Sequence, residues 1–252
     1  MKKLIAANWK MNKTVGDSLS AAKELKTLVK GIGNVDIIIC PPFTSLQVVS
    51  KELKGSNIGL GAQNMYHESS GAFTGEISPL MLKGLGCEYV ILGHSERREF
   101  FGESNELINK KIVAALSYGL KPIFCVGETL EQRQKEETED VLESQLISCL
   151  KDIKDLKNIT IAYEPVWAIS RGNTNQKAAT KADAEESHLF IRKAIEGIFD
   201  EKTAKNTRII YGGSMKPENA KELLSMRNID GGLVGNASLD AKSFSEIVKA
   251  AE

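Results

Sequence analysis

Four side chains that could do chemistry lie just after short apolar runs. Asn8 and Lys10 follow the run LIAA. His94 follows VILG, and Glu164 follows IAY. A carboxylate, an imidazole and an ammonium group, with no metal-ligand pattern and no nucleophile, indicate removal of a proton from a carbon next to a carbonyl. Glu164 would be the base, while His94 and Asn8 would donate hydrogen bonds to the oxygen that gains negative charge.

Each of these residues also has an ordinary structural interpretation when it is taken alone. A lone His94 is equally consistent with a structural histidine. Glu164 precedes Pro165 and could simply end a turn, which is the commoner role of an isolated glutamate. Lys10 alone is most often a solvated surface charge. The chemical interpretation therefore requires a fold that places these side chains around one cavity.

Apolar runs of strand length alternate with longer stretches of helical period. Between the runs, apolar residues recur at helical spacing, as at Ile108, Ile112 and Ala115. Several runs are almost continuously apolar (DIIIC, YVILG, PIFCV), which is typical of parallel strands buried on both faces. We expect strands at 4–9, 35–40, 57–63, 88–93, 121–126, 159–164, 208–212 and 230–235.

Several helix starts are visible in the sequence. Thr129-x-x-Gln132 and Thr180-x-x-Asp183 resemble capping boxes, the second with Asp in place of Glu or Gln. The SERREF run after His94 also has the character of a helix start. A helix dipole at that position disfavours an imidazolium, so we expect His94 to be neutral.

Eight strand–helix units without a composition break or linker favour a single closed (β/α)₈ barrel, an α/β fold in which residues 1–252 form one domain. No G-x-G-x-x-G follows the first strand, which argues against an open dinucleotide-binding sheet. In such barrels the active site lies at the carboxyl ends of the strands. All four candidate side chains are expected at those ends.

Two glycine-containing turns follow the last two strands. Gly212-Gly213-Ser214 comes after the seventh strand, and Gly235-Asn236 after the eighth. Backbone N–H groups can approach a phosphate where side chains do not obstruct them, and barrels often bind phosphate at these two loops. Lys10 would add a full positive charge. Glycines that merely form tight turns are the alternative.

Composition excludes several classes of function. Lys plus Arg equals Asp plus Glu at 33 each, so no net field would attract nucleic acid or an anionic membrane. No apolar run approaches the roughly 20 residues of a membrane span. The four cysteines show no C-x-x-C spacing, and Cys40 and Cys125 lie in apolar runs as small hydrophobes. We therefore expect a cytoplasmic protein with no metal site.

Long motifs distributed over nearly the whole chain resemble triosephosphate isomerase. They are ANWKMN at 7–12, GAFTGE at 71–76, VILGHSERR at 90–98, CVGETLEQR at 125–133, AYEPVWAI at 162–169, YGGSM at 211–215 and DGGLVGNASL at 230–239. The resemblance implies interconversion of dihydroxyacetone phosphate and D-glyceraldehyde 3-phosphate through an enediolate, in glycolysis and gluconeogenesis, without a cofactor.

The resemblance also assigns roles to individual residues. Glu164 aligns with the base of the family and His94 with its electrophile. Asn8 and Lys10 align with the pair that holds the substrate, and Glu96 with a glutamate that follows the histidine. The phosphate-binding positions correspond to Ser170, Ser214, Gly235 and Asn236. The lid of the family corresponds to Pro165, Val166, Trp167, Ala168, Ile169, Ser170, Arg171 and Gly172, with Ile169 and Leu233 closing over the base.

The polar stretch from 64 to 77 resembles the dimer loop of the family. It shows no clear periodicity, and loops of this length inside a compact domain are usually functional. The resemblance implies a homodimer in which the tip of the loop enters a pocket beside the active site of the other subunit. Thr74 would reach across, and Glu76 would pair with Arg97 of the partner subunit.

The sequence departs from the family pattern around the phosphate site. Position 170 is Ser where the family usually has Gly, the stretch SRGNTNQKAAT is longer than the common form, and position 236 is Asn where a second Gly is usual. These changes concern the lid and the phosphate site, not the reaction class. Two alternatives remain: a non-catalytic phosphosugar-binding barrel, suggested only by the altered lid, and another phosphate-binding barrel enzyme. Glu164, His94 and Lys10 argue against the first, and the absence of a Schiff-base lysine or second acid at a strand end argues against the second.

Overall fold

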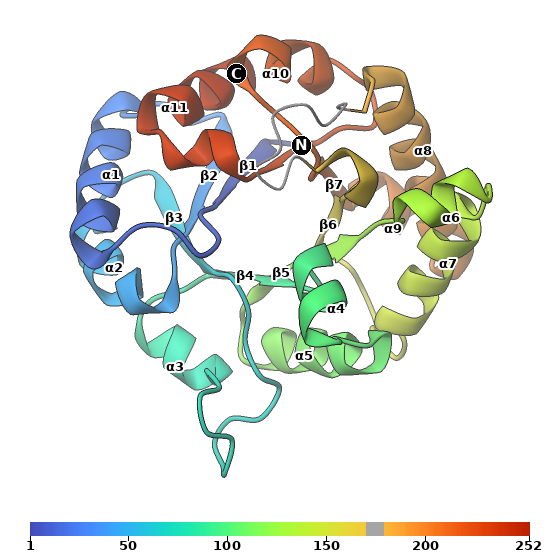
Figure 1. Cartoon of the computed structure of the whole chain (residues 1–252), viewed down its shortest axis with the longest axis horizontal. Helices are drawn as coiled ribbons and strands as arrows, with labels where there is room; N and C mark the ends of the chain where they lie inside the picture. Colours follow the sequence, from blue (N-terminus) through green and yellow to red (C-terminus); the bar gives the residue numbers. More distant parts are fainter. Residues whose placement is uncertain (170–178) are drawn as a thin grey trace.

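Eight parallel strands close into a barrel in chain order, with the last strand paired to the first (Figure 1). The computed structural model describes residues 1–169 and 179–252. The predicted (β/α)₈ barrel is thereby confirmed. The strands are β1 (Lys3–Asn8), β2 (Val35–Cys40), β3 (Ile58–Ala62), β4 (Tyr89–Leu92), β5 (Lys121–Val126), β6 (Thr160–Tyr163), β7 (Arg208–Tyr211) and β8 (Gly231–Val234).

The predicted strand ranges differ from the observed ones by at most one residue at each end. Glu164 shows why. Its N–H still donates to the carbonyl oxygen of Val126, at 2.7 Å, yet the chain has already left the ladder and turned towards Pro165. The polar residues that end the predicted strands therefore lie at the rim of the barrel, where side chains can face a ligand.

Helices surround the strands as an outer ring (Figure 1). The α-helices are α1 (Val15–Leu28), α2 (Leu46–Leu53), α3 (Pro79–Gly84), α4 (Ser95–Phe101), α5 (Asn105–Ser117), α6 (Leu130–Gln134), α7 (Thr138–Cys149), α8 (Lys181–Ile198), α9 (Glu201–Asn206), α10 (Pro217–Leu224) and α11 (Ala241–Ala250). Short 3₁₀ helices are η1 (Phe43–Ser45), η2 (Val166–Ala168) and η3 (Asn236–Leu239). Helix α9 has no counterpart among the sequence expectations.

The predicted helix starts are confirmed. Thr129 and Gln132 form a complete capping box at the start of α6, and Thr180 and Asp183 form one at the start of α8. The shorter Asp side chain suffices because both of its hydrogen bonds to Thr180 are made within 3.0 Å. Helix α4 begins at Ser95 with His94 as its N-cap residue, as the SERREF run predicts.

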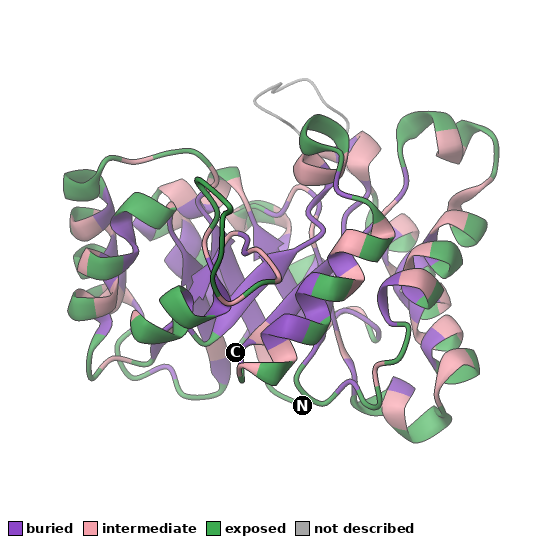
Figure 2. Ribbon diagram, turned by 90° about the horizontal axis from the view of Figure 1, so that it is seen from below, coloured by how far each residue is buried: buried purple, intermediate pink, exposed green. Residues whose placement is uncertain are grey.

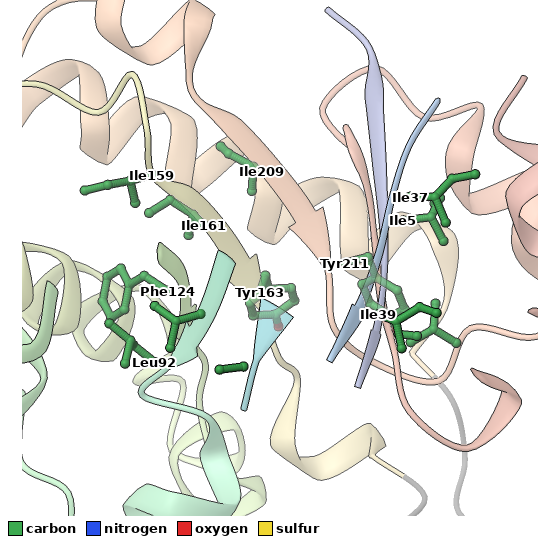
Figure 3. Close-up of a cluster of buried hydrophobic side chains, with 14 of the residues drawn as sticks. Ile5, Ile37, Ile39, Leu92, Phe124, Ile159, Ile161, Tyr163, Ile209 and Tyr211 are labelled. Atoms are coloured by element: carbon green, nitrogen blue, oxygen red, sulfur yellow. The ribbon is translucent and has the colours of Figure 1, made fainter. Parts of the chain in front are cut away.

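The apolar core has two parts, separated by the wall of the barrel. Alternate strand residues point into the barrel, among them Leu4, Ile38 and Ile91. The intervening residues pack against the helices, and Figure 3 shows Ile5, Ile161 and others of this outer layer. Both faces of each strand are thus buried (Figure 2), which explains the nearly continuous apolar runs in the sequence.

All four cysteines are buried and free. Burial raises the pKa of Cys149 to about 11 and that of Cys87 to about 12, so these thiols stay protonated and unreactive. Among the described residues, no helix is long and apolar enough to cross a membrane. Within the same residues, no three His, Cys, Asp or Glu side chains are grouped as metal ligands would be.

A buried histidine makes stability depend on pH. His188 on α8 lies fully buried, with Nδ1 3.1 Å from the carbonyl oxygen of Asn228, and burial lowers its pKa to about 4. The unfolded chain therefore binds this proton more readily than the folded one does. The stabilisation is complete above the unfolded pKa near 6.5 and is lost as the pH falls through about 4.

We expect the free energy of unfolding to fall on the order of 2–3 kcal/mol between pH 7 and 4.5 through His188 alone. The measurement is urea unfolding at both pH values and at one protein concentration, for the wild type and for His188→Phe, which packs a ring of similar size but does not titrate. The difference in the free energy of unfolding between the two proteins separates the contribution of His188 from that of the titrating carboxylates. A difference that is the same at both pH values would contradict the expectation.

Candidate active site

The predicted site residues meet around one cavity at the carboxyl ends of the strands. The cavity has a volume of about 380 Å³. The predicted residues among those that line it are Asn8, Lys10, His94, Glu164, Ile169, Ser214, Leu233, Gly235 and Asn236. The convergence that the chemical interpretation required is therefore present. Ser170, Arg171 and Gly172, predicted for the lid and the phosphate contact, lie outside the described residues.

Glu164 is buried and held by two donors. The backbone N–H of Ser95 donates to Oε2 at 2.8 Å, and Nε2 of His94 lies 2.9 Å from Oε1. Burial alone would raise the pKa of Glu164, but contact with His94, the Ser95 hydrogen bond and nearby Lys10 outweigh burial and lower it. Glu164 is therefore a carboxylate at neutral pH, as a base must be.

The backbone around Glu164 is fixed by close packing. A side chain on Gly127 would place its Cβ only 1.8 Å from the main-chain oxygen of Glu164. A Cβ on Gly212 would lie 2.8 Å from Cγ of Glu164. Glycine at these two positions lets β5 and β7 approach the base from both sides, so the carboxylate has little freedom to drift.

His94 is oriented by the helix that it caps. Its Nδ1 accepts a hydrogen bond from the backbone N–H of Glu96 at 3.2 Å. A nitrogen that accepts cannot also carry a proton, so the ring proton of this arrangement is on Nε2, which faces Glu164. The geometry is that of a neutral imidazole that donates into the cavity, which agrees with the expectation from the helix start.

Lys10 reaches the cavity through an unusual backbone conformation. Its φ of 50° is in the left-handed region that non-glycine residues seldom adopt. The conformation is held by hydrogen bonds from the Lys10 N–H to Asn8 Oδ1 at 3.0 Å and from Gln63 Nε2 to the Lys10 oxygen at 2.9 Å. Nζ lies 2.5 Å from Oε1 of Glu96, so Glu96 aims the ammonium group. Strain of this kind is usually retained at functional sites.

The glycines after β7 and β8 are not turn glycines. Gly212, Gly213 and Gly235 have negative or extended φ angles, so the tight-turn alternative does not explain them. A Cβ on Gly213 would lie 2.2 Å from the hydroxyl of Tyr211, and one on Gly235 would lie 3.5 Å from Cε of Lys10. Close approach of neighbouring atoms is the reason for glycine at Gly212 and Gly213, whereas a Cβ at Gly235 would make only an ordinary van der Waals contact.

Asn236 also needs no left-handed backbone. It is not among the residues with positive φ, and it begins η3 with its preceding residue Gly235 at φ −86°. Replacement of the usual family glycine by Asn is therefore compatible with the local backbone.

The dimer-loop residues lie apart from the cavity of their own chain. The loop projects beside α3 (Figure 1), and Thr74 and Glu76 are exposed. Arg97 donates from Nε to Oε1 of Glu103 at 2.6 Å and lies over the ring of Phe101. Thr74 and Glu76 do not line the cavity.

Sequence reasoning missed the buried carboxylate of Glu128 beside the site. Glu128 follows β5, is fully buried, and accepts hydrogen bonds from the hydroxyl of Tyr163 at 3.1 Å and from Nε1 of Trp167 at 2.7 Å. The available signal was a charged residue immediately after the apolar run PIFCV and Gly127. Lys216, which also lines the cavity, was likewise not singled out.

All the comparisons with known proteins identify the same protein family. A family model described as "Triosephosphate isomerase" matches residues 3–251. Relatives with that name include those of Carboxydothermus hydrogenoformans, 53% identical with 98% of each chain covered, and Chlorobium phaeobacteroides, 54% identical with 99% of each covered. A crystal structure of triosephosphate isomerase from Bartonella henselae superposes with a TM-score of 0.90 at 41% identity, and 99% of each chain is covered.

Proposed function

The chain belongs to the triosephosphate isomerase family, and we propose that Glu164, His94, Asn8, Lys10 and Glu96 carry out its reaction in the cavity described above. The activity is the aldose–ketose isomerisation of dihydroxyacetone phosphate and D-glyceraldehyde 3-phosphate, a step of glycolysis and gluconeogenesis. The assignment of each residue to a role is our proposal.

Glu164 removes a proton from the carbon next to the substrate carbonyl. The pair of electrons left behind moves onto the carbonyl oxygen and gives an enediolate. The Nε2–H of His94, which faces Glu164 at 2.9 Å, turns to that oxygen together with the amide of Asn8. Glu164 then returns the proton to the neighbouring carbon. The hydroxyl on the first carbon gives up its proton and becomes the new carbonyl, while the original carbonyl oxygen takes up a proton and becomes a hydroxyl, with His94 between the two oxygens. No redox partner is needed, because one hydrogen moves between adjacent carbons and one between their oxygens within a single molecule.

The phosphate group of the substrate is held at the opposite end of the cavity. The backbone around Ser214, Gly235 and Asn236 lines this end, where η3 begins. Lys10 provides the positive charge, and its contact with Glu96 keeps the ammonium group aimed at the cavity. The reacting carbons then lie between Lys10 and Glu164, since both line one cavity.

One observation supports this assignment above the others. A buried, ionised glutamate receives hydrogen bonds from Ser95 and His94 on the floor of a cavity that also contains Lys10. A barrel that only bound phosphosugars would gain nothing from a buried carboxylate near the sugar carbons. This argues against the non-catalytic alternative.

We also propose that the protein is a cytoplasmic homodimer. The loop 64–77 carries exposed Phe73, and exposed Leu80 and Met81 follow it on α3. This apolar surface would be covered by a second copy, with Thr74 entering the partner. Four buried free thiols suit a reducing compartment.

The direct test is isomerisation of glyceraldehyde 3-phosphate, coupled to reduction of the product, in H₂O and in D₂O. We expect turnover in both, and deuterium from solvent on the product carbon, because the proton held by Glu164 exchanges before it returns. Added chelator should leave the rate unchanged. Binding of the phosphosugar without turnover would favour the non-catalytic barrel.

A further inference from the structure

Glu128 anchors the short helix that follows the base. The backbone N–H of Val166 donates to the main-chain oxygen of Glu128 at 3.1 Å, and Nε1 of Trp167 donates to its Oε1 at 2.7 Å. Both donors belong to η2, which starts two residues after Glu164. The position of η2 therefore depends on Glu128, through its main chain at Val166 and through its carboxylate at Trp167. Ile169, which lines the cavity, follows η2 directly.

Arg133 on α6 contacts three groups at once. Its guanidinium lies over the indole of Trp167, 4.3 Å from the ring centroid. Nη1 is 3.5 Å from Oε1 of Glu128, and Nη2 is 2.7 Å from Oδ1 of Asp183 on α8. Only a planar, forked cation can stack on a ring and also reach two carboxylates on different sides. Lysine would keep the charge but would lose the stacking and one of the two contacts.

Asp183 belongs to the first turn of α8. Its Oδ2 accepts from the N–H and the hydroxyl of Thr180, at 2.9 and 2.6 Å, and so completes the capping box. The contact with Arg133 uses the other oxygen, Oδ1. Partial burial would raise the pKa of Asp183, but Thr180 and Arg133 outweigh burial and lower it. The carboxylate is thus charged and oriented for both partners.

The guanidinium of Arg133 therefore touches both places at which the chain borders residues 170–178. Helix η2 ends at Ala168, just before them, and α8 begins with its Thr180–Asp183 cap just after them. Helices α6 and α8 lie on the same side of the barrel (Figure 1). Glu128 and Asp183 are far apart in sequence, and Arg133 contacts both.

We propose that Arg133 is a positioning residue for the isomerase site. It couples η2, which carries Trp167 and precedes Ile169, to the first turn of α8, so that the positions of η2 and of this turn depend on each other. This inference rests on the proposed function, because its effect on catalysis runs through Glu164 and the cavity that Ile169 lines. Arg133 itself does not line that cavity.

The coupling predicts a dependence on pH. Burial raises the pKa of Glu128, while hydrogen bonds from Trp167 and Tyr163 and the charge of Arg133 lower it. The groups that face this carboxylate are Tyr163 on β6, Trp167 on η2 and Arg133 on α6, with Asp183 on α8 beyond Arg133. Without the cation Glu128 takes up a proton at higher pH; one of its oxygens then becomes a donor, and the hydrogen bonds from Trp167 and Tyr163 are no longer made to a charged acceptor. The acid limb of the activity profile should then begin at a higher pH.

Arg133→Met tests the proposal, because Met keeps an unbranched apolar chain but has neither the positive charge nor the forked guanidinium of Arg. We expect kcat/KM for glyceraldehyde 3-phosphate to fall roughly 3- to 30-fold, the acid limb to shift upward, and the emission of Trp167 to move to longer wavelength. Arg133→Lys should restore the acid limb but only part of the rate. The matched control is Lys135→Met, which removes a cation paired with exposed Glu131 at 2.7 Å and should leave all three readouts unchanged.

A double-mutant cycle isolates the coupling itself. Glu128→Gln and Asp183→Asn each weaken one side of Arg133, and we expect the loss in the double variant to be smaller than the product of the single losses, because both act through one guanidinium. In the Arg133→Met background the two losses should simply multiply. The inference would be overturned if the losses in kcat/KM multiply in the wild-type background. It would also be overturned if the Arg133→Met enzyme has wild-type kcat/KM and an unshifted acid limb.

Failure of the inference and failure of the proposed function give different results. If the wild type does not isomerise the substrate, the proposed function is wrong, whereas the emission of Trp167 in the Arg133 variants still reports on η2. If the wild type is active and loses activity on Glu164→Gln but not on Arg133→Met, only the positioning role is wrong. A lower melting temperature alone would not support the role, because any lost ion pair can cause it.

Discussion

Glu164→Gln is expected to lower kcat by at least about three orders of magnitude, because general base catalysis is typically worth about 10²–10⁴-fold. Gln has nearly the same shape, and its amide oxygen can still accept from the Ser95 N–H that now donates at 2.8 Å. Its NH₂ group, however, faces Nε2 of His94 and cannot accept a proton from carbon. The fold should survive while the base is lost.

The effect should fall on kcat and much less on KM. The phosphate end of the cavity, around Ser214, Gly235 and Lys10, is not altered by the substitution. The measurement is steady-state kinetics with glyceraldehyde 3-phosphate, with circular dichroism to show that the variant is folded. Glu246→Gln, an exposed residue on α11, is the matched control and should keep wild-type rates. If the Glu164→Gln enzyme keeps a tenth of wild-type turnover, Glu164 is not the base.

Shortening of residues 69–75 is expected to give a folded but nearly inactive monomer, with activity lower by about 10²-fold or more. The loop contributes little to the barrel core, because the residues around its tip are exposed. Phe73 packs on Tyr66 with their ring centroids 4.6 Å apart, so the loop carries its own small apolar cluster outward. Loss of this cluster would remove the proposed contact with a second copy without opening the barrel.

Light scattering gives the mass of each species, and the assay is run on the separated species. Thr74→Arg provides a second variant of full loop length, in which a bulky charge at the tip should block the pocket of the partner. Thr27→Arg on the exposed face of α1 is the matched control and should remain dimeric and active. Full activity in a species of monomer mass would show that the second copy is not needed for the site.

The sequence by itself determined the path of the chain through the barrel. Apolar runs such as VDIIIC and KPIFCV became strands with the predicted bounds, because a strand buried on both faces must be apolar along its whole length. Helix starts at Thr129 and Thr180 were also predictable, since a capping box is made within four consecutive residues. Both signals are local, and no distant residue can supply or cancel them.

The candidate site could be predicted as a set of residues because barrel closure brings all strand ends to one rim. His94 and Glu164 had to meet once β4 and β6 were assigned, and the cavity confirms that they do. The structural role of each glycine could not be predicted from the sequence. Gly213 is required by the hydroxyl of Tyr211, and Gly127 by the main chain of Glu164, and neither neighbour is visible until the strands are packed.

Only the tertiary structure decided how the functional groups are held. The donor that fixes Glu164 is a backbone N–H 69 positions earlier in the chain, and the carboxylate that aims Lys10 is 86 positions away. Arg133 reads in the sequence as one more charge on a short helix, yet it contacts Trp167, Glu128 and Asp183 together. Hydrogen bonds and ion pairs act over a few ångströms, so side chains find these partners only after the closed barrel has set the distances between its helices and strands.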